Sequence, residues 1–317
     1  MLDTIETVLV PVDGSDHANT AAHYGDRLAR AAGARMELLH VFEDTPGILM
    51  QRMGYTAGQA VESRVSAEAF DQMRQASARR AFEKTRASLP EDADVTDRIL
   101  SGDPADAVSH YAAGMDNAVI VMGRRGAGQI RELLMGSVSE GVIHQANCPV
   151  TVITHDPAHP EYSAGGSVLI VPVDESEQSL NATRYANTVA TATGAVVHLL
   201  HVFPASPREI HSTIGTTMVE ISATDAFEEE NFRKIAQESA AATFAQAREQ
   251  FDLDTVAVED VRRPGQPAAA IINHARATAN AEVIMARHGH GRIREFLLGS
   301  VSQRVLHAAH CPVTVVH

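Results

Sequence analysis

Two glycine-rich segments of the same spacing are the residues of this chain best suited to hold a ligand. They read Gly123-x2-Gly126-x9-Gly136-Ser137 and Ala286-x2-Gly289-x9-Gly299-Ser300. Glycine corners that open a helix leave backbone N–H groups facing an anion, and the positive end of the helix dipole adds to the attraction. The spacing therefore predicts two phosphate-binding loops, of which the second is altered at its first position.

These loops lie at equivalent places in two copies of one domain. Residues 8–42 align without gaps with residues 169–203. Residues 124–152 align with residues 287–315, and 19 of these 29 positions are identical. Because the period is far longer than that of a solenoid repeat, the pattern indicates duplication of a whole domain.

A stretch without periodicity separates the two copies. Residues 154–167 are rich in proline, glycine and polar residues, which is typical of a linker. We place the boundary near 156–166. The chain is thus expected to form two domains, 1–155 and 166–317, each long enough to bury its own core.

Within each copy, short apolar runs alternate with helical stretches. In the first copy we expect strands at 8–12, 36–42, 95–100, 118–122 and 149–153, and helices at 16–32, 67–88, 137–146 and from Pro104, behind an Asp103 cap. This alternation predicts an α/β domain with a doubly wound, five-stranded parallel sheet. Ligands of such sheets bind outside the carboxyl ends of the strands, where Asp13, Val41 and Gly123 fall.

Composition limits the partners of the chain. The net charge of −14 argues against a general nucleic-acid surface and against anionic membranes. Two cysteines, Cys148 and Cys311, are too few for a disulfide framework and fit a reducing compartment. With no long apolar run to span a membrane, we expect a cytoplasmic protein.

The sequence contains no recognisable catalytic set. It lacks the Gly-x4-Gly-Lys-Ser/Thr phosphate loop and the Gly-x-Ser-x-Gly nucleophile elbow. The 16 histidines include His40 and His201 at equivalent strand ends, and we interpret these as satisfied, partly buried residues and not as metal ligands. We therefore expect a binding protein.

Taken in order, three motifs resemble the universal stress protein family. They are the first strand with Val-Pro-Val-Asp-Gly-Ser, the glycine loop before Gly-Ser, and the closing strand Cys-Pro-Val-Thr-Val. The resemblance covers essentially the whole chain as two tandem domains. It implies a Rossmann-like fold of the adenine nucleotide alpha hydrolase type and, because members with such a loop bind ATP, an ATP-dependent stress-response module with Mg²⁺ held through the phosphates.

The resemblance also assigns site residues by position. In the first domain it places the adenosine end at Asp13 and Val41, and the ribose and phosphates at Gly123, Gly126, Gly136, Ser137 and Ser139. In the second domain the equivalent positions are Asp174, Val202, Gly289, Gly299, Ser300 and Ser302.

The second copy departs from the first at three of the positions near this site. Ala286 replaces Gly123, Glu175 replaces Gly14, and His288 replaces Arg125. The changes add a methyl group, add a negative charge and remove a positive one, while Arg262 and Arg263 offer compensating charge at a place that the sequence does not fix. We predict that the first domain holds ATP more tightly.

The resemblance implies an assembly as well. In the family the fifth strands pair across a dimer interface, so residues 149–153 and 312–316 are expected to meet within one chain as an intramolecular pseudo-dimer. The expected ligand is an adenine nucleotide. A slow ATPase or phosphotransfer enzyme and a nucleotide-independent interaction scaffold are the alternatives. A protein partner is also expected, and its identity is not readable from the sequence.

Overall fold

The computed structural model describes residues 4–42, 66–125, 135–154, 167–203, 229–289 and 298–317. The chain divides into two compact units, one of residues 4–164 and one of residues 165–317 together with 1–3. The expected linker near 156–166 lies outside the described residues.

The first unit is built on five parallel strands. These are β1 (Thr7–Pro11), β2 (Arg35–Phe42), β3 (Val95–Ser101), β4 (Ala118–Gly123) and β5 (Val150–Ile153). They lie in the order β3-β2-β1-β4-β5, and each neighbouring pair is parallel. The connecting helices are α1 (Asp16–Ala32), α3 (Ala67–Arg86), α4 (Pro104–Ala113) and α5 (Ser137–Gln145).

The second unit repeats this topology. Its strands are β6 (Val168–Pro172), β7 (Val196–Phe203), β8 (Val258–Pro264), β9 (Ala281–Ala286) and β10 (Val313–Val316), in the order β8-β7-β6-β9-β10. Its helices are α6 (Glu177–Thr193), α8 (Glu229–Arg248), α9 (Pro267–Ala277) and α10 (Ser300–Ala308). The predicted tandem of doubly wound parallel sheets is confirmed.

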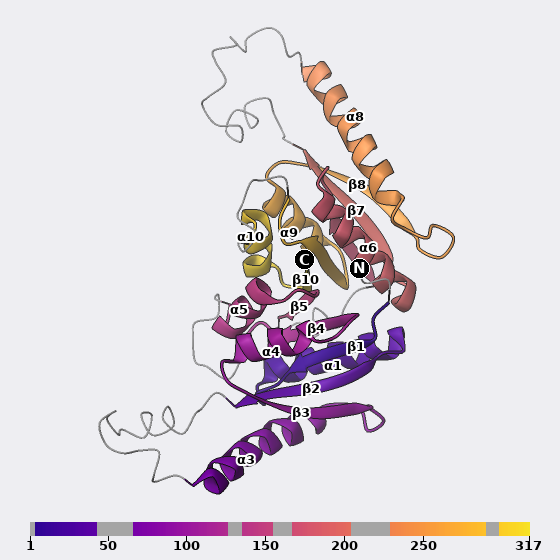
Figure 1. Cartoon of the computed structure of the whole chain (residues 1–317). Coiled ribbons are helices and arrows are strands. Elements are labelled where there is room, and N and C mark those ends of the chain that lie inside the picture. The colour runs from indigo at the N-terminus through magenta and orange to yellow at the C-terminus, as the bar shows by residue number, and fades with distance from the viewer. Residues whose placement is uncertain (1–3, 43–65, 126–134, 155–166, 204–228, 290–297) are drawn as a thin grey trace, which may run out of the picture. The chain divides into compact units, whose positions relative to one another are not determined.

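Helices cover both faces of each sheet (Figure 1). In the first unit α1 contacts α3, and α4 contacts α5, as expected when the crossovers on either side of β1 leave on opposite faces. The residues of β4 are buried throughout, and those of β1 are buried up to Pro11. This explains why both strands read as continuous apolar runs.

Local sequence sets where these helices begin. Asp103 accepts hydrogen bonds from the N–H groups of Ala105 and Asp106 at the start of α4, and Pro104 opens that helix, as predicted. The cap of α1 is Ser15, whose Oγ accepts from the N–H of Ala18 at 3.2 Å. The first helix therefore begins at Asp16, three residues after Asp13.

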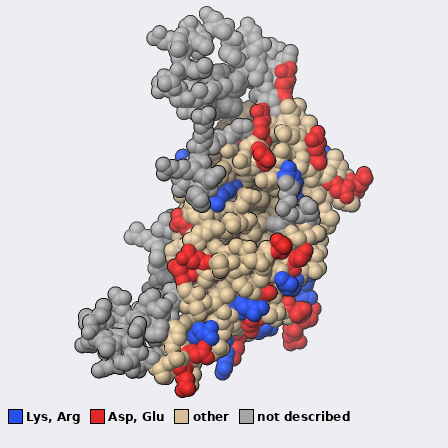
Figure 2. Space-filling model, in the orientation of Figure 1, with Lys and Arg blue, Asp and Glu red and all other residues tan. Residues whose placement is uncertain are grey.

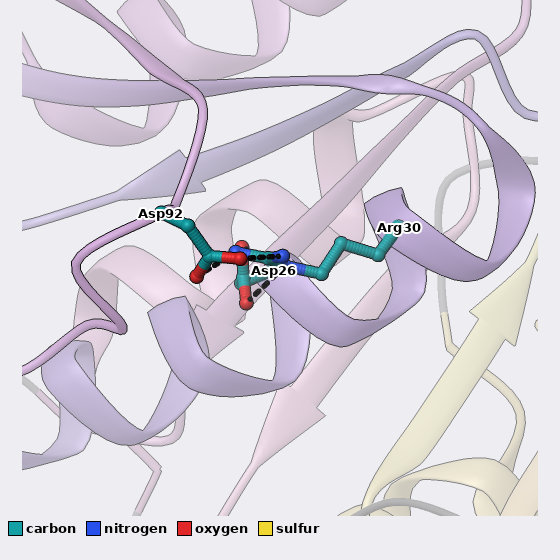
Figure 3. Close-up of polar contacts among 3 residues, drawn as sticks. All are labelled: Asp26, Arg30 and Asp92. Carbon is teal, nitrogen blue, oxygen red and sulfur yellow. Dashed lines mark hydrogen bonds and ion pairs between the residues drawn. The ribbon is translucent and has the colours of Figure 1, made fainter.

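An arginine fixes the far end of α1. Arg30 donates to Asp26 on the same helix at 2.9 Å and to Asp92, in the turn before β3, at 2.8 Å (Figure 3). Hydrogen bonds from Arg30 lower the pKa of the Asp92 carboxyl below its usual value, and those to Asp92 and Asp26 raise the pKa of Arg30. The contact links the last turn of α1 to the turn before β3.

Gly123 permits a close approach between α1 and the end of β4. A Cβ atom built on Gly123 would lie 2.7 Å from the carbonyl carbon of His17 and 2.8 Å from the Cβ of that residue. Gly123 ends β4 and does not have a positive φ, so its role here is close packing. In the second unit the equivalent Ala286 is accommodated at 8% exposure.

One pair of facing side chains differs in kind between the units. In the first unit the Tyr111 hydroxyl donates to Glu37 at 2.7 Å. In the second unit the equivalent residues are His274 and His198, whose Nε2 and Nδ1 atoms lie 3.1 Å apart. Both pairs join the helix before the fourth strand to the second strand.

The charged neighbours of the histidine pair fix its tautomers. The guanidinium of Arg263 lies 3.3 Å from Nδ1 of His274 and offers only donors, so that nitrogen accepts. Nε2–H of His274 then donates to His198, whose own Nε2–H points to Glu259 at 3.5 Å. Burial, with Arg263 and His198 as further causes, lowers the pKa of His274 to about 4.

Replacing Gly123 by Ala should destabilise the first unit. The added methyl group must displace the backbone of His17, and overpacking of this kind costs roughly 1–3 kcal/mol. Ala286→Gly, the reverse exchange in the second unit, should cost only about 0.5–1 kcal/mol. Urea unfolding followed by circular dichroism measures both. Equal losses would show that the approach of His17 is not the constraint.

The histidine pair should make the second unit sensitive to acid. The pKa of His274 is lowered from an unfolded value of about 6.5, so its contribution to stability is present above that pH and is lost as the pH falls toward about 4. His274→Gln keeps a donor and an acceptor without titrating. It should therefore weaken the dependence of the urea midpoint on pH between pH 6.5 and 4.

The control for this experiment is His110→Gln, which changes an exposed histidine on α4. We expect it to keep the wild-type dependence of the urea midpoint on pH. A His274→Gln variant with the wild-type slope would contradict the assignment of acid sensitivity to the pair.

Candidate functional site

The predicted site residues of the first unit gather at one edge of the sheet. β1 lies between β2 and β4, so the carboxyl ends of these three strands are neighbours. Pro11 is in register with Leu39, which sets Asp13 level with Val41 two residues further on. Gly123 ends β4 on the other side of β1. The structure thus brings Asp13, Val41 and Gly123 together at the switch in strand order.

Asp13 presents its carboxylate at the surface of this edge. The residue is exposed, and its Oδ1 accepts a hydrogen bond from the N–H of Ser15 at 2.9 Å. Because Ser15 caps α1, Asp13 stabilises the turn that precedes the helix. An exposed carboxylate held in this way can accept hydrogen bonds from the hydroxyl groups of a ligand.

The N-terminus of α5 lies at the end of the loop that follows β4. Gly136 is the N-cap and has no side chain with which to bond the first turn, and its own N–H donates to the carbonyl of Arg124 at 2.9 Å. Ser137 is the first helical residue and is exposed. A helix start without a side-chain cap directs N–H groups and positive partial charge outward. Gly126 lies outside the described residues.

Ser139 is buried and does not lie at the surface of the site. It is 2% exposed, and its hydroxyl donates to the carbonyl of Gly123 at 2.9 Å. Ser302 repeats this in the second unit, at 3% exposure and 2.9 Å from the carbonyl of Ala286. These hydroxyls tie the helix after the loop to the end of the fourth strand. Their assignment to the nucleotide stays a prediction.

The aspartate of the second unit is more enclosed. Oδ1 of Asp174 accepts from the N–H of Ser176 at 3.0 Å and also from its hydroxyl. A Cβ atom built on Gly289 would lie 2.5 Å from Oδ2 of Asp174, so this carboxylate sits against the glycine loop. Asp174 is half-buried where Asp13 is exposed. The structure brings Asp174 and Gly289 together and leaves less of the carboxylate open to a ligand.

The turn after the first strand also differs between the units. Gly14 has φ +77, a conformation that Glu175 does not adopt. The methylene stem of Lys84 passes over Gly14, with Cδ 3.6 Å from where a Cβ would stand, and its Nζ lies 3.6 Å from Asp16. Sequence reasoning missed Lys84, because α3 carries no motif that points to this turn.

The two units place opposite charge beside this turn. Counted from Phe82 and Phe244, which pack alike on His40 and His201, the counterpart of Lys84 is Gln246. The first unit therefore has glycine and a lysine at the turn, and the second has a glutamate and a glutamine. An anionic ligand is favoured electrostatically at the first.

The arginines after the fourth strands and those in β8 have different surroundings. Arg124 is buried, and burial together with the charge of Arg125 lowers its pKa. Arg287 contacts His317 at 3.1 Å, and burial lowers its pKa. The guanidinium of Arg262 lies 5.5 Å from the ring centre of Phe244, while Arg263 faces His274. The contacts seen for Arg262 and Arg263 thus join them to α8 and α9.

Other chemistries find little support in the part of the chain that the structure describes. Burial raises the pKa of Cys148 and of Cys311 to about 12, which keeps both thiols protonated near neutral pH. Among the described residues no group of three or more His, Cys, Asp or Glu side chains could hold a metal ion. No described helix has the length and apolar character needed to cross a membrane. Figure 2 shows acidic and basic side chains interspersed on one face, with uncharged surface between them.

Known proteins similar to this chain include a sequence relative and two solved structures. A universal stress protein of Mycolicibacterium smegmatis is 28% identical over 98% of this chain and 96% of its own length. The crystal structure of a universal stress protein from Archaeoglobus fulgidus covers 98% of this chain and 97% of its own, at 21% identity and a TM-score of 0.61. A second protein from that organism, solved in complex with dAMP, covers 47% of this chain and 96% of its own, at 19% identity and a TM-score of 0.33.

The family itself is shown by its sequence model. The model of the universal stress protein family matches residues 4–154 and again residues 167–317. The two matches correspond to the two sheets described above, and together they account for almost the whole chain. The chain belongs to the universal stress protein family and carries two of its domains in tandem.

Proposed function

We propose that this protein is a nucleotide-dependent stress-response module that binds ATP in its first unit. The observation that carries the proposal is the meeting of Asp13, Val41 and the uncapped start of α5 at the switch point of one parallel sheet. A carboxylate suits the hydroxyl groups of a ribose, and a helix start suits phosphate. One edge of the sheet thus offers both ends of a nucleotide a fitting group.

Different residues are assigned to the nucleoside and to the phosphates. Asp13 and the main chain of Val41 hold the nucleoside, while the backbone at Gly136 and Ser137 holds the phosphates. Mg²⁺, when bound, neutralises phosphate charge and is held through the phosphates. Lys84 supports the same assignment, since it sets a positive charge beside the turn that carries Asp13.

The second unit is proposed to bind nucleotide more weakly. Asp174 already accepts two hydrogen bonds from Ser176 and rests against Gly289. Glu175 adds a second carboxylate at the same turn, where the first unit has Gly14. A polyphosphate entering this site meets more negative charge and a carboxylate that is less available.

Nucleotide can regulate the protein if the bound and free forms of the first unit differ in their contacts with a protein partner. A ligand shifts a conformational equilibrium only through different affinities for its two states. We propose that nucleotide binding shifts such an equilibrium in the first unit and so sets a surface that a protein partner distinguishes. No hydrolytic step is needed for this role.

Purified protein should release adenine nucleotide on denaturation. With one tight site, mass spectrometry of the released ligand should give a ratio near one ATP per chain. A ratio near two would show that the second unit is equally competent. Protein that releases no nucleotide and shows no thermal shift with added ATP would overturn the proposal.

The phosphate end is tested by replacing Gly136 with Asp or with Asn. Both residues are favoured helix caps, so α5 should form in both variants. Only Asp brings a negative charge to the phosphates, and it should weaken ATP binding at least about tenfold, or roughly 1.4 kcal/mol, relative to Asn. Isothermal titration calorimetry on protein stripped of nucleotide measures the difference.

Gly299→Asp is the matched change in the second unit. It should leave the tight binding isotherm as in the wild type. Loss of that isotherm in Gly299→Asp with retention in Gly136→Asp would assign the tight site to the second unit. Equal affinity in Gly136→Asp and Gly136→Asn would remove α5 from the phosphate site.

A further inference from the structure

A buried histidine links the two strand ends that we assign to the nucleoside. His40 precedes Val41 in β2, and its Nδ1 lies 2.9 Å from the carbonyl oxygen of Val12, which precedes Asp13. The side chain is 8% exposed. Because a carbonyl only accepts hydrogen bonds, Nδ1 carries the proton.

The rest of the ring is held by α3. Nε2 of His40 lies 3.0 Å from the hydroxyl of Ser77, and in the neutral ring this nitrogen accepts from it. The edge of the imidazole packs on Phe82, with ring centres 6.1 Å apart and an angle of 77°. The ring thus has one orientation, set by a turn, a helix and its own strand.

The imidazole of His40 takes the place of a backbone donor in the β1–β2 ladder. The N–H of Val12 donates to the carbonyl of Leu39 at 2.7 Å, as the next rung of a parallel ladder. In a continued ladder the carbonyl of Val12 would accept from the N–H of Val41, two residues after Leu39. The β1–β2 pairing ends at Pro11, and it is the imidazole of His40 that donates to this carbonyl.

The second unit repeats the arrangement. Nδ1 of His201 lies 3.1 Å from the carbonyl of Val173, and the N–H of Val173 donates to Leu200 at 3.0 Å. Phe244 packs on His201 with ring centres 6.1 Å apart at 78°. The ring therefore keeps its place even though the turn beside it has changed from Gly14 to Glu175.

We propose that His40 is a positioning residue of the nucleotide site: by donating to the Val12 carbonyl, it ends the β1–β2 ladder and leaves the N–H of Val41 for an acceptor on the nucleobase. The same hydrogen bond fixes the residue that precedes Asp13. His40 touches no ligand and acts through its neighbours. This inference rests on the proposed function, and it adds that the nucleoside end is set by a side chain from β2.

The test compares His40→Leu with His40→Asn. Leu removes the donor, whereas the Asn amide can still donate to the Val12 carbonyl. We expect calorimetry to show ATP and adenosine binding weakened about tenfold in His40→Leu, the effect of one hydrogen bond, and largely restored in His40→Asn. Inorganic tripolyphosphate, which lacks a nucleoside, should compete equally well for the wild type and for both variants.

Two further variants separate positioning from stability. Phe82→Leu removes the edge contact and leaves the hydrogen bond, so it should lower the melting temperature and keep the affinity for adenosine. His201→Leu makes the matched change in the second unit and should leave the tight isotherm unchanged. Parallel weakening of adenosine and tripolyphosphate in His40→Leu would indicate a general structural loss and would overturn the inference.

The wild-type protein gives a direct readout as well. The amide resonance of Val41 should shift on addition of adenosine, and this shift should be absent in His40→Leu at the same adenosine concentration. An unperturbed Val41 amide in adenosine-bound wild type contradicts the inference while the proposed function stands. If the wild type binds neither ATP nor adenosine, the proposed function fails first.

Discussion

Parallel pairing of β1 with both β2 and β4 is the constraint on which the first unit depends. The crossovers on the two sides of β1 leave on opposite faces, so the carboxyl ends of these strands are not covered by a connecting helix from either neighbour. Backbone groups that the ladder no longer satisfies must find other partners there. The carbonyl of Val12 finds His40, and Gly136 bonds to Arg124. The features assigned to ligand binding all stand where regular pairing stops.

The duplication shows which parts of this design tolerate change. Both units keep the strand order, the second-strand histidine that bonds to the turn after the first strand, and the serine hydroxyl that ties the last helix to the fourth strand. They differ in charge and in close packing: Lys84 has no cationic counterpart, and Ala286 stands where the first unit needs glycine. The scaffold is thus preserved by hydrogen bonds to backbone carbonyls, while the side chains that set electrostatic preference vary.

Sequence reasoning succeeded where the signal is local. Alternating apolar runs predicted a doubly wound parallel sheet and the element bounds to within about two residues. Asp103-Pro104 marked the start of α4 because both residues act on their immediate neighbours. The contacts of Lys84 with the Gly14 turn and of His40 with Ser77 join residues far apart in the chain, and no spacing rule encodes them. The inward hydroxyl of Ser139 was also not foreseeable, since it depends on how α5 docks on β4.

The two cysteines carry a consequence for oxidative conditions. Peroxides react with the thiolate form, and a pKa of about 12 leaves a thiolate fraction on the order of one in 10⁵ near neutral pH. Conversion to sulfenic acid is correspondingly slow for Cys148 and Cys311, which stand in the same Cys-Pro-Val-Thr-Val segment of each unit. Thiol oxidation is therefore disfavoured at both positions, which lie two residues before the closing strands β5 and β10.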